Sequence, residues 1–406
     1  MTHDTNIPQG YKATALGIIP QEWEVMRLGD IVSITSGESP SLYHLKAEGK
    51  YPYVKVEDLN NCEKYQESSR EYSDDNNTTI KAGSIIFPKR GASILNNKVR
   101  IAAKDIQMDS NMMAITPHTA IVDTEFLYIR ILHERLYRIA DTSSIPQINN
   151  KHITPYKIAV PPLAEQRKIA EVLGVWDEAI EKQARLIEKL ALRKRGLMQR
   201  LLSAKLRLPG FSEPWQKVNY SDILKEVRRT LIWDENELYD LISVRRRSGG
   251  VFHRESLYGH EIKTKTLRPA LDGDFLISKM QIVHGASGVV QKQLSGMKIS
   301  GSYIALIAKD PKKLNINYFN LWSQMPMFYH QTFVSSYGVH IEKMTFDLDA
   351  FMSLSMNLPP IEEQNRIVEV ISTATEEIEL AKEKLEHLRR QKRGLMQQLL
   401  TGKKRI

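Results

Sequence analysis

The sequence of 406 residues predicts an α+β protein, in which two globular mixed α/β domains are separated by two long helices that form an antiparallel coiled coil. Three observations predict this fold. The segment from Pro161 to Leu202 recurs from Pro359 to Leu400 without a gap, at a constant offset of 198 residues, and such an internal repeat decides the architecture. Apolar residues in both copies follow helical spacing. Short apolar runs bounded by turn residues surround the copies, as strands do. The fold is therefore expected to be a pseudo-two-fold internal repeat.

The repeat divides the chain into five parts, and similarity between the domains themselves is fainter. The predicted parts are an N-terminal segment (1–20), a first domain (21–160), a central helix (161–206), a second domain (207–358) and a C-terminal helix (359–406). The fainter echoes pair residues 23–32 with 215–224, 82–87 with 271–277, and Ser143-Ser144 with Ser335-Ser336. The element around Gln147 has no clear match in the second domain. Predicted strands are 84–87, 112–115, 157–160 and 303–308, and predicted shorter helices are 124–138 and 318–329.

Each long helix carries a narrow apolar stripe in which successive members are three or four residues apart. That spacing is typical of helices that pack along a seam. Gln183, Lys194 and Lys392 occupy stripe positions that an apolar residue would otherwise fill. The predicted seam residues are Ile169, Leu173, Trp176, Ile180, Ile187, Leu190, Leu197 and Leu201 in the first copy, and Ile367, Ile371, Ala374, Ile378, Ala381, Leu385, Leu388, Leu395 and Leu399 in the second.

The repeated Pro-Pro pair ends the preceding extended segment, and Glu165 or Glu363 follows in the first turn, where a negative charge meets the positive end of the helix. At a rise of ~1.5 Å per residue, a helix from Glu165 to Leu202 is about 57 Å long. Gly196 and Gly394 lie inside the two helices, at a cost of roughly 1 kcal/mol each relative to alanine. Either both glycines serve a close backbone approach, or each helix breaks there.

Composition limits the possible classes of protein. Hydrophobic residues make up 42% and charged residues 26%, with a mean hydropathy of −0.37, which excludes extensive disorder. Cys62 is the single cysteine, so neither an intramolecular disulfide nor a zinc site with two thiolates can form. No secretory signal and no membrane-length apolar run occurs, and the cytoplasm is the expected location. The net charge of +9 favours an anionic partner such as nucleic acid.

Three motifs follow one another along the chain. The opening combines Tyr11-Lys12 with residues 17–20 (Gly-Ile-Ile-Pro) and 22–25 (Glu-Trp-Glu-Val). The second, Pro-Pro-(Leu/Ile)-x-Glu-Gln, occurs at 161–166 and 359–364, and the third, Lys-Arg-Gly-Leu-Met-Gln-x-Leu-Leu, at 194–202 and 392–400. In this order and in tandem, they resemble the DNA-specificity (S) subunit of type I restriction-modification systems, over essentially the whole chain.

The resemblance implies a non-catalytic subunit with two target-recognition domains, each of which recognises one half of a split sequence in double-stranded DNA. It also implies two methyltransferase subunits as partners and, in the restriction form, restriction/translocase subunits. No membrane partner is expected, because no apolar run is long enough, and no cofactor or metal is expected in this chain. The repeat supports such a geometry independently, because two similar domains related by a pseudo-two-fold axis match the symmetry of duplex DNA. Since the domains differ in sequence, the two half-sites are expected to differ.

The sequence lacks the usual catalytic motifs, and two alternatives stay open. Val160 and Leu163 flank the first Pro-Pro pair, where an adenine methyltransferase needs a polar residue and an aromatic one. Neither a phosphate-binding Gly-x-x-x-x-Gly-Lys-(Ser/Thr) loop nor a Gly-x-Gly-x-x-Gly loop occurs. Asp240, Glu261 and Lys263 leave open a metal-dependent nuclease. The paired helices leave open a coiled-coil scaffold without a DNA role.

The candidate DNA contacts are basic and amide side chains beside Gly and Ser, in loops that could approach a DNA backbone. Arg and Lys favour guanine and phosphates, whereas Asn and Gln favour adenine. Basic runs at 193–195 and 389–393 either face phosphates or keep the helices soluble. The candidates are Lys89, Arg90, Ser93, Asn96, Asn97, Lys98 and Arg100 in the first domain, and Arg245, Arg246, Arg247, Lys279, Gln281 and His284 in the second.

Overall fold

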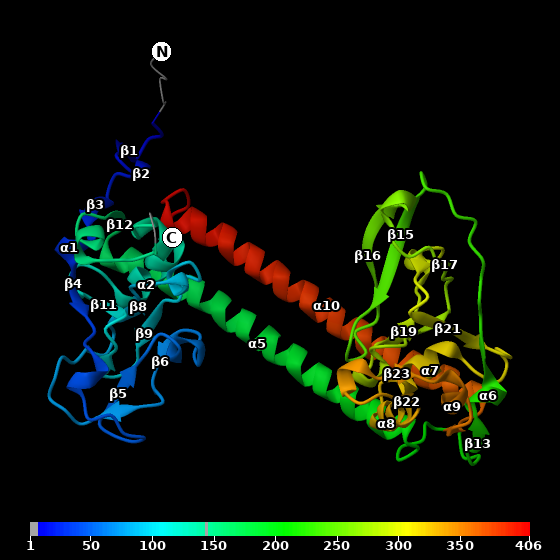
Figure 1. Ribbon diagram of the computed structural model, residues 1–406. Helices are drawn as coiled ribbons and strands as arrows, with labels where there is room; N and C mark the ends of the chain where they lie inside the picture. The colour runs from blue at the N-terminus through cyan, green and yellow to red at the C-terminus, as the bar shows by residue number, and fades with distance from the viewer. Residues whose placement is uncertain (1–6, 143–144) are drawn as a thin grey trace. The chain divides into compact units, whose positions relative to one another are not determined.

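The computed structural model describes residues 7–142 and 145–406 (Figure 1). The chain divides into two compact units, which we call unit 1 (residues 1–184 and 383–406) and unit 2 (residues 185–382). Residues 1–6 of the predicted N-terminal segment and the pair Ser143-Ser144 lie outside the described residues. Each unit contains part of both long helices, whereas the boundaries derived from the sequence treat the helices as separate parts.

Unit 1 is built on a five-stranded sheet with the strand order β4-β11-β8-β9-β6, in which only β6 and β9 pair in parallel. Successive side chains of a strand point to opposite faces, so Ile85 of β8 belongs to the same hydrophobic core as Trp23 and Phe126, while Ile86 belongs to a second core with Val54 and Met112. The strands are β1 (Tyr11–Thr14), β2 (Gly17–Pro20), β3 (Glu24–Arg27), β4 (Val32–Ser36), β5 (Tyr51–Val54), β6 (Tyr65–Gln66), β7 (Tyr72–Ser73), β8 (Ile85–Pro88), β9 (Arg100–Ala102), β10 (Gln107–Met108), β11 (Met112–Pro117) and β12 (Lys157–Val160), and the short helices are α1 (Leu28–Ile31), α2 (Thr124–Glu134), α3 (Leu136–Ile139) and α4 (Asn150–Ile153).

Unit 2 contains a four-stranded antiparallel sheet, β14-β21-β18-β19, and a second sheet, β16-β15-β20-β17, with a long hairpin at its edge. Phe275 of β18 packs with Phe319, while the next residue, Leu276, packs with Ile242 of the second sheet. The strands are β13 (Gln216–Asn219), β14 (Leu224–Glu226), β15 (Leu238–Val244), β16 (Val251–Tyr258), β17 (Arg268–Pro269), β18 (Phe275–Ser278), β19 (Ser287–Val289), β20 (Lys298–Ile299), β21 (Tyr303–Ala308), β22 (Ser336–Tyr337), β23 (Thr345–Phe346) and β24 (Ser355–Leu358), and the short helices are α6 (Tyr220–Ile223), α7 (Ile316–Trp322), α8 (Pro326–Val334) and α9 (Leu348–Met352).

The two units share a common plan, which explains the fainter sequence echoes. The order β4-β11-β8-β9 in unit 1 corresponds to β14-β21-β18-β19 in unit 2, and the pair β3–β12 corresponds to β13–β24. All four strands predicted from the sequence are confirmed, as β8, β11, β12 and β21. The α+β fold class with two related domains is therefore confirmed.

Both predicted shorter helices are interrupted. The segment 124–138 forms α2 and α3, which are separated at Arg135 by a left-handed φ of 63°. There the side chain of Asn97 accepts the N–H of Leu136 and donates to the carbonyl of Leu132, so a side chain replaces helical backbone bonds. The segment 318–329 forms parts of α7 and α8, because Pro326 starts a new helix.

The long helices are α5 (Leu163–Leu202) and α10 (Ile361–Leu400), each of 40 residues. Both continue through Gly196 and Gly394, so the prediction that they break there is wrong. A Cβ at either glycine would meet no atom within 4 Å, so close backbone packing does not explain them either. In the described part of the chain, no helix combines the length and the apolar character needed to cross a membrane.

In each unit the two long helices pack against each other in antiparallel fashion. In unit 1, Ile169 near the start of α5 shares a core with Leu399 near the end of α10. In unit 2, Leu190 of α5 packs with Ile378 and Ala381 of α10. Every residue of the predicted seam is buried or partly buried. The 4-3 apolar spacing therefore marks the face along which the helices pack.

The repeated Glu of the Pro-Pro-(Leu/Ile)-x-Glu-Gln motif anchors each helix to its domain. Glu165 accepts the indole N–H of Trp23 at 3.0 Å and two hydrogen bonds from Arg405 at 2.7 and 3.0 Å. Glu363 accepts the indole of Trp215 at 2.9 Å and two hydrogen bonds from Arg207 at 2.7 and 2.9 Å. These carboxylates do more than complement a helix dipole, because each joins three segments of its unit.

The repeated Gln orients the helix that covers the sheet. Gln166 accepts the N–H of Asp123, the N-cap residue of α2, at 2.7 Å and donates to the carbonyls of Ile121 and Pro161. Gln364 accepts the N–H of the N-cap residue of α7 at 2.9 Å and donates to two carbonyls in the same way. Both glutamines are fully buried. The motif is therefore a structural clamp, used once in each unit.

Candidate nucleic-acid interface

The first candidate loop follows β8 in unit 1. The carbonyl of Lys89 accepts the N–H of Ile148, and Gly91 donates to the carbonyl of Pro146 at 2.9 Å, so the loop lies against residues 146–148. Gly91 has a φ of 83°, which favours glycine. Burial and the adjacent Arg90 lower the pKa of Lys89. Two neighbouring cations, one half-buried and one exposed, thus form a positive end to the strand.

Other candidates in unit 1 differ in their accessibility. Arg100 donates to the carbonyls of Cys62, Val99 and Leu59, each at 2.8 Å. Like Asn97 at the α2–α3 junction, Arg100 therefore already has hydrogen-bond partners inside the unit. The remaining candidates carry no such internal bonds in the described structure, and they are Ser93 (partly buried), Asn96 (exposed) and Lys98 (partly buried).

The arginine triplet of unit 2 lies in the turn between β15 and β16. Arg247 and Ser248 both have left-handed backbones, with φ of 57° and 54°. The turn is held by backbone hydrogen bonds from Arg247 N–H to His284 O at 2.7 Å and from Ser248 N–H to Gly285 O at 2.8 Å. The Ser248 hydroxyl also hydrogen-bonds the Tyr329 hydroxyl at 2.8 Å. These contacts fix the turn against the segment after β18.

Thus the structure brings two separate sequence candidates together in unit 2. Arg246 donates to the side-chain oxygen of Gln281 at 2.7 Å and pairs with Glu342 at 3.1 Å. His284 Nε2 lies 3.1 Å from the other Glu342 oxygen, outside hydrogen-bonding alignment. Arg245 stacks on the ring of Phe252, with its guanidinium 4.0 Å from the ring centroid. Glu342 therefore offsets the charge of Arg246, while Arg245 and Arg247 are exposed and take part in no ion pair within the described residues.

Lys279 lines a different hollow, of about 470 Å³, with Arg228, Arg229 and Arg268. These three arginines are not among the candidates predicted from the sequence, although the adjacent pair at 228–229 is a visible signal there. Most of their charge is used internally. Arg229 forms a bidentate pair with the buried Asp274, and Arg268 donates to the carbonyl of Tyr303. This hollow is therefore less suited to phosphate than its composition suggests.

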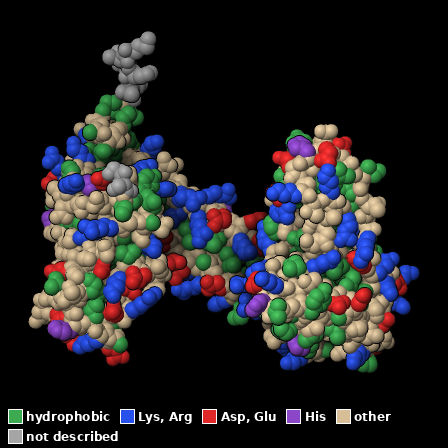
Figure 2. Space-filling model, in the orientation of Figure 1, with side chains coloured by type: hydrophobic (Ala, Val, Ile, Leu, Met, Phe, Trp, Pro, Cys, Tyr) green, Lys and Arg blue, Asp and Glu red, His purple; other side chains and the backbone are tan. Residues whose placement is uncertain are grey.

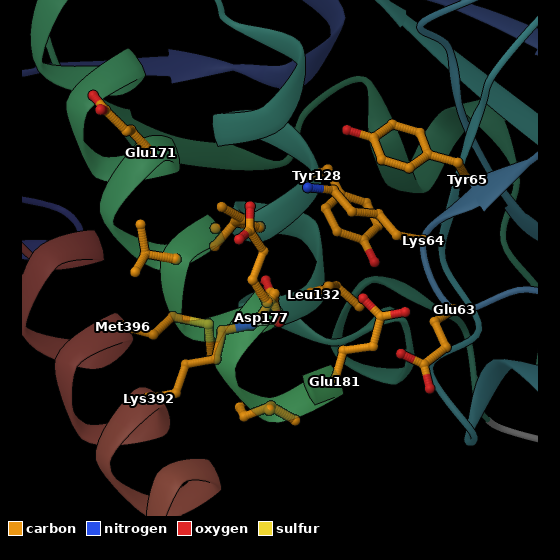
Figure 3. A pocket seen from close by; sticks show the side chains of 15 residues that line it. Glu63, Lys64, Tyr65, Tyr128, Leu132, Glu171, Asp177, Glu181, Lys392 and Met396 are labelled. Carbon is orange, nitrogen blue, oxygen red and sulfur yellow. Dashed lines mark hydrogen bonds and ion pairs between the residues drawn. The ribbon is translucent and has the colours of Figure 1, made fainter. Parts of the chain in front are cut away.

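Charged side chains are distributed unevenly at the local scale, although they are mixed over the visible surface. In Figure 2, basic and acidic side chains are mixed on the visible faces of both units, so the net charge of +9 does not gather into one basic face there. A hollow of about 760 Å³ lies in unit 1, between the β6 region, α2 and the long helices, and Figure 3 shows the side chains that line it. We call it the acidic hollow, because its lining holds five carboxylates against two lysines, namely Glu63, Glu171, Asp177, Glu178 and Glu181 against Lys64 and Lys392. Its charge disfavours a DNA backbone.

The residues of the nuclease alternative make separate local bonds. Asp240 accepts a hydrogen bond from Ser256, and this bond holds the pKa of Asp240 below its ordinary value. Glu261 accepts the backbone N–H of Tyr258 at 2.7 Å. Among residues 7–142 and 145–406, no group of three or more His, Cys, Asp or Glu side chains is arranged to hold a metal ion.

A family model for the type I restriction modification DNA specificity domain matches the chain twice, at residues 20–191 and 212–390. The chain belongs to this family. Over 96% of its length it is 23% identical to the type I restriction enzyme MjaVIII specificity subunit of Methanocaldococcus jannaschii, covering 94% of that protein.

Two solved structures share the fold of this DNA specificity family member. One is the S subunit of a type I restriction-modification system from M. genitalium, with a TM-score of 0.55, 14% identity and 98% coverage of both chains. The other comes from a study of complex assembly and conformational transition of the type I R-M system, with a TM-score of 0.63, 17% identity, and coverage of 95% of this chain and 99% of that one.

Proposed function

We propose that this specificity-family chain recognises a split sequence in double-stranded DNA, one half with each unit, and has no catalytic activity of its own. The observation that carries the proposal is the duplicated clamp. Glu165 with Gln166, and Glu363 with Gln364, hold equivalent helices against equivalent sheets, yet the exposed loops that follow β8 and β18 differ in sequence. Two domains with the same scaffold but different loop sequences are suited to recognise two half-sites of different sequence.

The proposed partners are two methyltransferase subunits and, in the restriction form, restriction/translocase subunits. This proposal is supported by the family membership and by the described assembly of a structurally similar type I R-M system. The chain needs no cofactor in this scheme, because the partners carry the chemistry. The cytoplasm, where the DNA and these partners meet, is the proposed location.

The test is to reconstitute the full chain with its methyltransferase and to map the methylated adenines. A split motif with a fixed spacer is expected, and it should be absent when this chain is omitted. The variant Arg245→Ala should relax recognition in one half of the motif only, because a good bidentate base contact contributes about 1–3 kcal/mol of discrimination. A continuous motif, or the same motif without this chain, would refute the proposal.

A further inference from the structure

A second hollow, of about 530 Å³, lies in unit 2 between the end of α5, the start of α8 and the β15–β16 turn. We call it the basic groove. Three cations line it, Lys194 and Arg195 from α5 and Arg247 from the turn, and no Asp or Glu is among its described lining residues. Ser248 and Tyr329 add hydroxyl groups to the same lining. The groove therefore concentrates positive charge beside neutral hydrogen-bonding groups.

The basic groove and the acidic hollow contain corresponding residues of the repeat but have opposite charge. Lys194 and Met198 of α5 correspond by the repeat offset to Lys392 and Met396 of α10, which line the acidic hollow (Figure 3). Lys392 is paired with Asp177. The repeat places a threonine, residue 375, at the position of that aspartate, and its hydroxyl donates to a backbone carbonyl instead. The positive charge of Lys392 is thus offset by an ion pair in unit 1, whereas Lys194 has no corresponding aspartate in unit 2.

The cations of the basic groove carry no ion pair within the described residues, and surrounding contacts hold the backbone of one of them, Arg247, in place. No ion pair involves Lys194, Arg195 or Arg247 in the described part of the chain. Burial lowers the pKa of Lys194, Glu379 opposes this effect, and Lys382 adds to it. The left-handed backbone of Arg247 and Ser248 costs of order 1–3 kcal/mol per residue and persists only where surrounding contacts impose it. Those contacts hold Arg247 at the groove.

We propose that the basic groove binds a backbone phosphate of the DNA, whereas the acidic hollow of unit 1 does not. This inference rests on the proposed function only in taking DNA as the ligand. The two units then hold the duplex backbone differently, although their sheets and clamps are alike. A phosphate contact is independent of base sequence, so the groove sets register and affinity without changing which bases are recognised.

The test measures binding of the full chain to a duplex of unrelated sequence at several salt concentrations. The variant K194Q/R195Q/R247Q should bind roughly tenfold more weakly, and its slope of log affinity against log salt should shrink by about 0.9 for each phosphate that the protein no longer neutralises. The charge-conserving variant K194R/R195K/R247K should retain the wild-type slope, which separates loss of charge from misfolding. Lys392→Gln, the repeat counterpart, and Lys189→Gln, an exposed lysine of α5, should leave the slope unchanged.

Each outcome decides one question. A wild-type slope in K194Q/R195Q/R247Q overturns the inference, and so does an equal loss in Lys392→Gln. Inorganic phosphate or ATP could compete with DNA for the protein more strongly than sodium chloride does at equal ionic strength. If the triple variant loses this competition while its salt slope for DNA stays the same, the groove binds a free phosphate and the DNA assignment is overturned. If methylation mapping yields no split motif but the salt slope of K194Q/R195Q/R247Q is still reduced, the proposed function is wrong and the phosphate site in the groove stands.

Discussion

The clamp glutamines provide a quantitative test of how the helices stabilise each unit. Gln364 is fully buried and makes three hydrogen bonds with backbone groups, at 2.9 Å each. Each such bond contributes about 1 kcal/mol net, and its loss leaves a buried backbone group unsatisfied. Gln364→Ala should therefore lower the free energy of unfolding of unit 2 by about 3 kcal/mol. For a domain of this size that is a fall in Tm of about 6–12 °C.

The assay is thermal unfolding, combined with hydrogen exchange of peptides from each unit so that the transitions are assigned separately. Gln166→Ala should produce a similar fall in unit 1, because its three bonds are equivalent. Asn365→Ala is the matched control, since its exposed side chain accepts one hydrogen bond from Asn315. If Gln364→Ala shifts Tm no more than Asn365→Ala does, the clamp does not stabilise the unit and the reasoning is wrong.

Three further predictions follow from single residues. Ala204 has a left-handed φ of 57° after α5, so Ala204→Gly should raise the stability of unit 2 in urea by about 0.5–1 kcal/mol; no change would contradict the strain. Arg100→Ala should destabilise unit 1 by about 3 kcal/mol, because it removes three hydrogen bonds. The DNA affinity of the folded variant, measured by titration, should equal that of the wild type, and a lower affinity would identify Arg100 as a DNA contact. Hydrogen bonds from Tyr43 and Thr78 lower the pKa of Glu38 in the folded state. The stability that ionised Glu38 contributes is therefore present above its unfolded pKa and is lost as the pH falls through the lower folded pKa. Glu38→Gln should flatten this part of a curve of unfolding free energy against pH, and an unchanged curve would exclude the effect.

Parts of the fold could be predicted because they depend on local pattern. The stripe from Ile169 to Leu201 repeats every three or four residues, and that spacing alone defines a face that must be covered. The runs that form β8 and β21 are apolar and bounded by turn residues. The break at Arg135 could not be foreseen, because it depends on Asn97, which lies far away in the sequence and caps the second helix through space.

The candidate site shows the same division. Clusters of basic residues beside glycine drew attention to the loops at Lys89 and Arg245, but the sequence could not distinguish a free cation from a paired one. Arg100 reaches three backbone carbonyls and Arg246 meets Glu342 only after folding. Only the folded structure therefore shows which candidate side chains already have internal partners.

By itself, the sequence determined that this chain is a tandem repeat with two long helices and two related α+β domains, because repetition and apolar periodicity are properties of order along the chain. Tertiary structure alone decided the roles of the repeated Glu and Gln, and the opposite charges of the acidic hollow and the basic groove. The physical reason is that hydrogen bonding and charge compensation act between residues close in space, whatever their separation in sequence. The lysine of the repeated motif forms an ion pair where the fold brings it an aspartate, and lacks that ion pair where the repeat places a threonine instead.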